Sequence, residues 1–360
     1  MAYTQLISGF IALILTLAFV PRLQRFSIRY RFMLDPPSEH KIHQRPVPRV
    51  GGISMAVAFA LALISGLLLL KGSNPLTPTL GILAAGLGGL LLGICDDLYG
   101  LKAYQKFTGQ IGVTIVLLGS GFRIEQMVFP FFWGVVLPGP ISLVCTLFWV
   151  AATMNAINLI DGVDGLAAGL SLIAALGMLF LATHRGNASA MLIAAGIAGV
   201  CLGFLRYNFH PASIFMGDCG SMFLGATFAG LSLLLTDNGA TPGSLWIPIT
   251  FLTVPFLDTT LAIIRRKLRG QRFVVADKEH LHNQLLDFGL SQRQTVVVFY
   301  TLGLLMGAFA IACFYLTEVG AMSAIAIVGL VLLACGLVMT HLHHQGSFFQ
   351  RKKPWKDTAD

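Results

Sequence analysis

Two adjacent aspartates end a long apolar stretch, in the run Cys95-Asp96-Asp97-Leu98. Carboxylates in such a position suit a hard cation such as Mg2+. Successive residues of a helix point about 100° apart, so the two side chains cannot present one face to a single ion. We therefore predict that one of them ligates a metal and that the other has a separate role. The competing interpretation is an acid pair that caps a loop at a membrane surface.

A second polar motif, NAINLIDGVDG, occupies residues 155–165 and contains Asn158, Asp161 and Asp164. Its two glycines can interrupt a helix, which places the acids on a loop between apolar segments. Asparagine supplies both donors and acceptors, as recognition of a nucleobase or a ribose requires. The alternative is that Asp164 caps the following helix, and both interpretations can hold together.

A third motif, FMGDCGS, covers residues 215–221. We predict that Asp218 opens an apolar helix, and capping of that helix is its structural alternative. The flanking glycines permit close approach of a substrate to the backbone. Phe215 is a candidate for stacking on a base, although aromatic residues at a membrane edge are often interfacial anchors.

Two histidines, His280 and His282, flank a leucine in a charged stretch. Their spacing alone is weak evidence for a site. Asp258 differs from the other acids because it lies inside an apolar segment, seven residues before Arg265. An unpaired carboxylate at that depth is costly, so we expect a structural polar partner for it.

The elements that carry these residues are predicted to be transmembrane helices. The chain has 360 residues, of which 56% are hydrophobic and 11% are charged, whereas soluble domains carry about 25% charged residues. A span needs roughly 20 apolar residues, and we expect about eleven spans in an all-α polytopic bundle. Their predicted centres lie near residues 14, 60, 89, 114, 148, 174, 197, 228, 255, 305 and 330. The aromatic and proline-rich segment 128–140 is too broken to span and is expected to form a hairpin at the outer surface.

The distribution of basic residues predicts the orientation. With the N-terminus outside, all of the 24 Lys and Arg residues except Lys71, Arg123 and Arg185 lie in inner loops or in the C-terminal tail. Positive charge concentrates on the cytoplasmic side of membrane proteins, so the C-terminus is predicted to be cytoplasmic. We expect one transmembrane domain over residues 1–343 and a basic tail over 344–360. The net charge of +8 is explained by this topology and by anionic lipid, without a nucleic-acid partner.

In this topology the three acidic motifs share the cytoplasmic ends of separate spans, together with many cations. Acids next to hydrocarbon are expensive and mark functional sites. The combination favours a phosphate-bearing substrate whose Mg2+ is held by carboxylates. A cation-coupled transporter is the alternative, although transporters place ionisable groups near the bilayer midplane. A non-enzymatic lipid-binding scaffold would leave the acid clusters without a purpose.

The motifs together resemble the polyprenyl-phosphate N-acetylhexosamine-1-phosphate transferases of the WecA and TagO type, with MraY more distant. The resemblance covers about residues 41–295. Its pieces are KIHQRPVPRVGG, GICDDLYGLKAYQKFTGQ, NAINLIDGVDGLAAG, RYNFHPASIFMGDCGSMFLG, VPFLDTTLAIIRR and DKEHLHNQLL. Six pieces in the family's order are far more specific than any one of them.

The resemblance implies roles for individual residues. Asp96 and Asp97 correspond to the family's paired aspartates, and Asp218 to its metal-binding aspartate, with Asp97 as the second metal ligand. The NxxDGxDG motif would lie near the nucleotide. The remaining substrate-binding residues implied are the uridine-contacting Asn208, the base-stacking Phe215, and the first two histidines of an HxHH motif, His280 and His282. Apart from the resemblance, we predict that the basic residues Lys102, Lys106 and Arg265 of the inner loops bind the substrate and offset its charge. The chain departs from the family at Asn283, where a third histidine is usual.

The same resemblance implies a reaction. The enzyme would transfer a sugar-1-phosphate from a UDP-N-acetylhexosamine to undecaprenyl phosphate, using Mg2+ or alternatively Mn2+, and release UMP. UDP-GlcNAc is the first choice of donor, and the glycan pathway stays open. A phosphate monoester is mostly dianionic at neutral pH, so we favour direct attack with Asp96 positioning the lipid phosphate over an aspartyl-phosphate intermediate. The expected location is the bacterial inner membrane with the site facing the cytoplasm, and monomer and homodimer both stay open.

Overall fold

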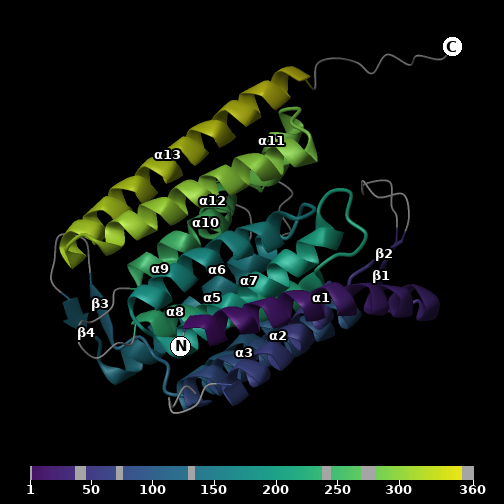
Figure 1. Cartoon of the computed structure of the whole chain (residues 1–360). Helices are drawn as coiled ribbons and strands as arrows, with labels where there is room; N and C mark the ends of the chain where they lie inside the picture. Colours follow the sequence, from purple (N-terminus) through teal and green to yellow (C-terminus); the bar gives the residue numbers. More distant parts are fainter. Residues whose placement is uncertain are drawn as a thin grey trace.

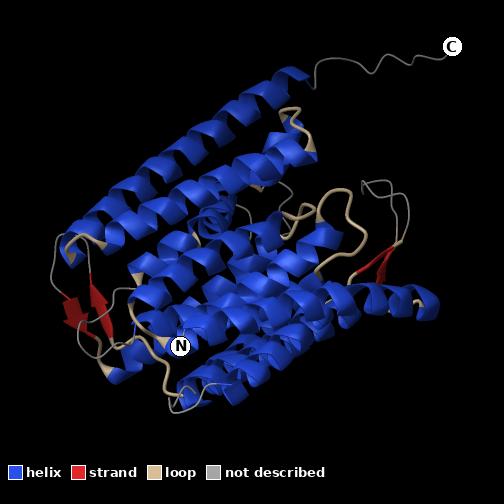
Figure 2. Cartoon of the chain, viewed as in Figure 1, coloured by secondary structure: helices blue, strands red, loops and turns tan. Residues whose placement is uncertain are grey.

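The computed structural model describes residues 2–36, 46–69, 76–128, 134–236, 245–268 and 280–350. Within this part the chain is almost entirely helical, with two short antiparallel hairpins (Figure 2). The elements in chain order are α1 (Ala2–Tyr30), β1 (Leu34–Asp35), β2 (Val47–Pro48), α2 (Gly51–Leu69), α3 (Leu76–Tyr99), α4 (Ala103–Gly119), β3 (Gln126–Val128), β4 (Gly134–Val136), α5 (Gly139–Ile160), α6 (Leu166–His184), α7 (Ala188–Asn208), α8 (Gly217–Thr236), α9 (Trp246–Phe251), α10 (Thr253–Leu268), α11 (Leu281–Asp287), α12 (Gln292–Phe314) and α13 (Glu318–Gln350).

In the described part of the chain nine helices are long and apolar enough to cross a membrane, namely α1, α2, α3, α5, α6, α7, α8, α12 and α13. The chain is therefore a multi-pass, all-α membrane protein. Every predicted span centre lies in a helix, but α4 has 17 residues and α10 has 16, which is shorter than the roughly 20 that a span needs. The count of eleven stays a prediction, as does the orientation of the termini.

The predicted span near residue 255 is divided into two helices. α9 ends at Phe251 and α10 begins at Thr253, with Leu252 between them. Pro255 lies in the first turn of α10 and has no N–H to donate to the carbonyl of Phe251. A continuous helix would lose that hydrogen bond, whereas the first turn of a new helix needs none there.

The hairpin expected in the segment 128–140 is present in the described residues. β3 and β4 pair antiparallel, with Gln126 opposite Val136. This hairpin lies at the opposite end of the bundle from α11 and from the β1–β2 hairpin (Figure 1). The three predicted acidic motifs lie at the end that holds α11, β1 and β2.

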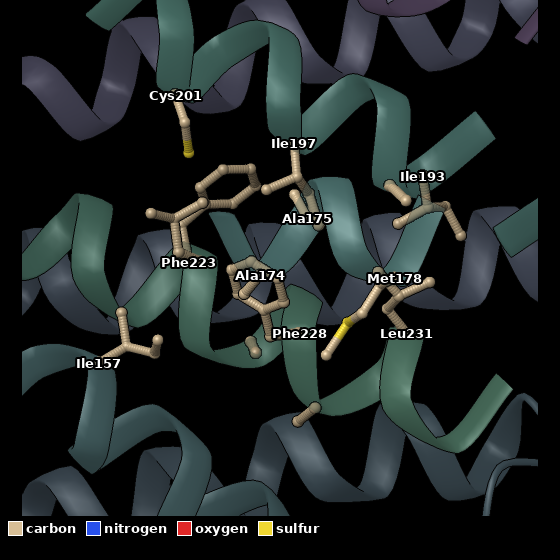
Figure 3. Packing of buried hydrophobic residues seen from close by; sticks show 14 of the residues in the cluster. Ile157, Ala174, Ala175, Met178, Ile193, Ile197, Cys201, Phe223, Phe228 and Leu231 are labelled. Atoms are coloured by element: carbon tan, nitrogen blue, oxygen red, sulfur yellow. The ribbon is translucent and has the colours of Figure 1, made fainter. Parts of the chain in front are cut away.

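α8 is the helix around which the bundle is packed. It lies against α2, α3 and α5, and 94% of the residues in its apolar stretch are buried. Phe223, Phe228 and Leu231 of α8 lie among side chains from α5, α6 and α7 (Figure 3). The end of α8 that begins at Gly217 is therefore held at a fixed depth by the whole core.

Two glycines permit backbone contact with the first turn of α8. A Cβ on Gly93 of α3 would overlap the carbonyl of Asp218, and a Cβ on Gly52 of α2 would overlap the backbone of Gly220. Any larger residue would separate these helices at the level of the acidic motifs. Close packing of α2 and α3 against α8 is what sets the spacing between Asp97 and Asp218.

We expect Gly93→Ala to destabilise the protein by about 1–3 kcal/mol or more, because the added methyl group must displace the backbone of α8. Activity should fall with stability, since the shift occurs next to the candidate site. Thermal unfolding in detergent would measure the effect. Gly112→Ala is the matched control, because its Cβ would meet nothing within 4 Å. An equal loss in both variants would contradict the close-packing argument.

Candidate active site

The carboxylate of Asp97 caps the N-terminus of α8. Its Oδ1 accepts the N–H of Asp218 at 3.1 Å, and its Oδ2 accepts the N–H of Cys219 at 2.9 Å. The first N–H groups of a helix have no partner inside the helix and carry partial positive charge. The contact therefore stabilises a carboxylate at this depth and fixes α3 to α8. Each oxygen of Asp97 keeps a second lone pair that could still ligate a cation.

The neighbouring Asp96 points to a different set of partners. Its Oδ1 accepts the N–H of Leu101 at 2.9 Å, and its Oδ2 forms an ion pair with Lys106. The Nζ of Lys106 also lies 3.5 Å from Oδ2 of Asp218, so this ammonium group joins the two carboxylates. The two adjacent aspartates thus have separate contacts, in keeping with their different directions on the helix.

Asp218 receives a further hydrogen bond from the second motif. The amide of Asn158 donates to Oδ1 of Asp218 at 2.8 Å and to the hydroxyl of Ser221 at 2.9 Å. Asn158 lies near the end of α5 and Asp218 at the start of α8, so this contact joins two motifs that are 60 residues apart. An amide donor favours the ionised form of a carboxylate.

The loop that follows α5 is held by its last acid and by a glycine. Oδ2 of Asp164 accepts from Nδ1 of His210 at 2.9 Å and from the N–H of Ala212 at 3.0 Å. Gly165 has a positive φ of +78°. Its N–H donates a hydrogen bond to Oδ1 of Asn208 at 3.0 Å, and its carbonyl accepts one from the hydroxyl of Tyr300 at 2.6 Å. Asp164 therefore braces the loop between α7 and α8 as well as its own.

Asn208 has both ends of its amide engaged. Its oxygen accepts from Gly165, and its Nδ2 donates to the carbonyl of Ile214 at 2.9 Å. The side chain is 3% exposed. Asn208 thus connects the Asp161–Gly165 loop to the loop before α8, and the uridine contact implied for it stays a prediction.

The two histidines surround the deep carboxylate Asp258. Nδ1 of His280 donates to Oδ2 of Asp258 at 2.8 Å, and the N–H of Leu281 donates to Oδ1 at 2.7 Å. The predicted structural partner of Asp258 is therefore His280 together with the start of α11. The imidazoles of His280 and His282 are stacked, with centroids 5.4 Å apart.

His282 is buried beside Gly162, where an added Cβ would collide with its Nε2. The pKa of His282 is lowered to about 4, mainly by burial, which outweighs the opposing effect of the nearby Asp258 carboxylate. The imidazole is neutral at pH 7 and lies against the loop that bears Asp161. Its neighbour Asn283, at the position where the family has a third histidine, lines the cavity described next.

A cavity of about 380 Å³ opens where these motifs meet. Its lining includes five carboxylates, from Asp35, Asp97, Asp161, Asp164 and Asp218. The predicted residues Asn208 and Phe215 also line it. Acids that are distant along the chain therefore share one space at one end of the bundle.

The other predicted residues lie around the cavity or away from it. Asp96, Lys106 and Asn158 contact Asp218 or its ion pair without lining the cavity. Lys102 is exposed at the start of α4, and Arg265 is buried near His282. The structure adds Asp35, Arg49 and Gln292 to the lining and Tyr300 behind it. Of these residues only Arg49 lies in a motif that the sequence analysis singled out, KIHQRPVPRVGG.

The donor set fits a divalent cation shared with a phosphate. Burial raises the pKa of Asp161 well above its usual value, and the negative charges of Asp218 and Asp97 raise it further. A cation would relieve this crowding of three carboxylates. In the described part of the chain no three His, Cys, Asp or Glu residues converge into a complete metal cage. Mg2+ is commonly held by one or two carboxylates and by substrate phosphates, and Asp97 and Asp218 of the cavity lining supply two carboxylates.

We expect Tyr300→Phe to weaken substrate binding more than turnover. The variant loses the hydroxyl that holds the carbonyl of Gly165, and such a hydrogen bond contributes about 1 kcal/mol. KM for the substrate that contacts the 161–165 loop should rise several-fold at nearly constant kcat. Tyr104→Phe is the control, since Tyr104 is exposed on α4. Unchanged kinetics in Tyr300→Phe would show that the loop does not need this contact.

Asp258→Asn should destabilise the protein by about 1.5–3 kcal/mol or detach α11, because it weakens the hydrogen bonds that His280 and Leu281 donate to a buried carboxylate. Since α11 carries His282 and Asn283 to the cavity, activity should fall in parallel. Glu125→Gln, in an exposed ion pair on the distant hairpin, is the control. Circular dichroism melting and an activity assay on the same preparation would measure both effects. Full activity in Asp258→Asn would contradict the proposed dependence of the cavity on α11.

Comparison with known proteins gives a consistent set of relatives. A family model described as Glycosyl transferase family 4 matches residues 79–236. The chain is 39% identical to a probable undecaprenyl-phosphate N-acetylglucosaminyl 1-phosphate transferase of Bacillus subtilis, over 85% of this chain and 84% of the relative. It is 37% identical to a decaprenyl-phosphate N-acetylglucosaminephosphotransferase of Mycolicibacterium smegmatis, over 73% and 71%. A phospho-N-acetylmuramoyl-pentapeptide-transferase of Clostridioides difficile is 36% identical, over 65% and 74%.

Proposed function

Because the chain belongs to glycosyl transferase family 4, as a polyprenyl-phosphate hexosamine-1-phosphate transferase, we propose that its reaction is the transfer of GlcNAc-1-phosphate from UDP-GlcNAc to undecaprenyl phosphate. UMP is the second product, and the transfer depends on Mg2+. The lipid-linked sugar begins a cell-surface glycan. The acceptor and the transferred sugar phosphate named for the Bacillus subtilis relative support this choice over a pentapeptide-bearing substrate.

One observation carries the proposal: Asp97, Asp161 and Asp218, from three separate motifs, line one cavity at one end of a membrane bundle. A soluble nucleotide sugar and a membrane-bound lipid phosphate can meet only at the membrane surface. The cavity's position at the end of the helices is suited to that meeting. A transporter would need its ionisable groups near the middle of the spans, and none of the relatives named above is a transporter.

The nucleotide is proposed to bind along the loops that precede α6 and α8. Phe215 lines the cavity, and its backbone is held by two hydrogen bonds, to Pro48 at 2.8 Å and from Gly51 at 3.0 Å. A backbone fixed in this way reduces the conformational freedom that is lost when the ring stacks on uracil. Asp161 also lines the cavity and is proposed to accept from a sugar or ribose hydroxyl.

Asp218 and Asp97 are the residues that would hold Mg2+, which would supply positive charge against the pyrophosphate. Lys106 already neutralises part of the charge of Asp96 and Asp218. The remaining carboxylates make the cavity too negative for a pyrophosphate without added cations. The described contacts thus favour a site in which substrate and metal arrive together.

The reaction is proposed to be a single displacement. An oxygen of the lipid phosphate forms a bond to the phosphorus that bears the sugar, and the bond from that phosphorus to UMP breaks, with the bridging oxygen leaving on UMP. Asp96 is 6% exposed, and both its oxygens are engaged by Leu101 and Lys106, which suits positioning better than nucleophilic attack. Retained configuration at a chiral phosphorus would contradict a single displacement.

The test is lipid-dependent release of UMP by the purified protein. UDP-GlcNAc with undecaprenyl phosphate and Mg2+ should give UMP, omission of the lipid or addition of EDTA should abolish it, and Mg2+ should restore it. Asp218→Asn should lower the rate at least about 100-fold, because it removes a carboxylate that is proposed to hold Mg2+. Glu125→Gln is the control for a distant charge change. A panel of UDP-sugars would identify the donor. UMP release at the same rate with and without undecaprenyl phosphate would contradict the proposal.

A further inference from the structure

The segment VPRVGG, at residues 47–52, brings a guanidinium group to the cavity. Of the described residues that line the cavity, Arg49 is the one Lys or Arg, and it faces five carboxylates. None of the roles considered above uses this arginine. A phosphate-bearing ligand in so acidic a cavity would gain from a cation that the protein itself provides.

Arg49 is held by an acid that is more deeply buried than itself. Its Nη2 lies 2.6 Å from Oδ1 of Asp35, and the exposed fractions of the two side chains are 43% and 6%. The guanidinium group has five N–H donors in a planar fork. Asp35 therefore holds one side of the group, and the rest of the partly exposed side chain belongs to a residue that lines the cavity.

The backbone around Arg49 is attached to Met33, just before β1, and to the two residues that precede α8. The N–H of Arg49 donates to the carbonyl of Met33 at 2.8 Å. The N–H groups of Gly51 and Gly52 donate to the carbonyls of Phe215 and Met216, at 3.0 and 2.9 Å. The backbone that carries Arg49 is thereby fixed relative to Phe215, which is proposed to stack on the base, and to Asp218 beyond it.

We propose that Arg49 binds phosphate oxygens of a substrate in this cavity and that Asp35 orients it for that contact. The inference rests on the proposed transfer reaction and deepens it. Two anions share the required chemistry: the pyrophosphate of the nucleotide sugar and the phosphate of the lipid. The structural alternative is an ion pair that only fastens the β1–β2 hairpin.

Two variants separate binding from folding. Arg49→Lys keeps the positive charge opposite Asp35 but loses the planar fork. The double variant Arg49→Gln with Asp35→Asn removes both charges and so leaves no buried acid without a partner. Arg206→Gln is the matched control, because Arg206 is an exposed arginine at the same end of the bundle that does not line the cavity. Thermal unfolding of each variant reports whether the hairpin still folds.

KM measurements with each substrate show which of the two phosphate groups Arg49 binds. We expect KM for one substrate to rise about tenfold or more in both Arg49 variants, with little change in the unfolding midpoint. A rise for UDP-GlcNAc at saturating lipid, with weaker binding of UDP but not of uridine, assigns Arg49 to the pyrophosphate. A rise for undecaprenyl phosphate at saturating donor assigns it to the lipid phosphate.

The outcomes also separate this inference from the proposed function. If the unaltered protein releases UMP in a lipid-dependent manner and both KM values in the folded Arg49 variants match those of Arg206→Gln, the inference is wrong and the proposed function stands. Loss of folding in Arg49→Lys, with normal KM in the folded double variant, would assign Arg49 to the hairpin alone. Absence of lipid-dependent UMP from the unaltered protein would remove the proposed function itself.

Discussion

The contact between the Asp97 carboxylate and the first N–H groups of α8 is the interaction on which the site depends. It resolves two problems at once, since an acid at the edge of a membrane bundle needs donors and a helix N-terminus needs acceptors. Because α8 is surrounded by α2, α3 and α5, the carboxylate is fixed by the packing of the whole bundle. The backbone approach at Gly93, four residues before Asp97, makes this contact geometrically accessible.

Around that contact the polar residues form two groups with different tasks. Lys106 and Asn158 act on the charge of Asp218, one as an ammonium group and one as an amide donor. Asn208 and Asp164 instead bind backbone groups and hold loops in place. Both groups come from the same motifs, so a motif that indicates chemistry also contains the residues that build its support.

Part of the site followed from residue type and spacing. The different directions of Asp96 and Asp97 on a helix predicted separate contacts, and the structure has them. The deep carboxylate Asp258 was expected to need a polar partner, but spacing could not identify His280, which lies 22 residues away beyond a change of chain direction. The role of Tyr300 could not be predicted from the sequence, because a tyrosine in an apolar helix looks the same whether its hydroxyl contacts a protein loop or lipid.

The sequence by itself determined the class of protein, the approximate places of its helices and the acidic motifs of its site, because apolar length and the cost of acids beside hydrocarbon are local properties. The tertiary structure alone decided which acids share a cavity, that α9 and α10 are separate, and that Arg49 lies among carboxylates. Those facts depend on which helices touch. Helix contacts are set by small residues meeting across the bundle, and no local pattern states which surface a glycine will meet.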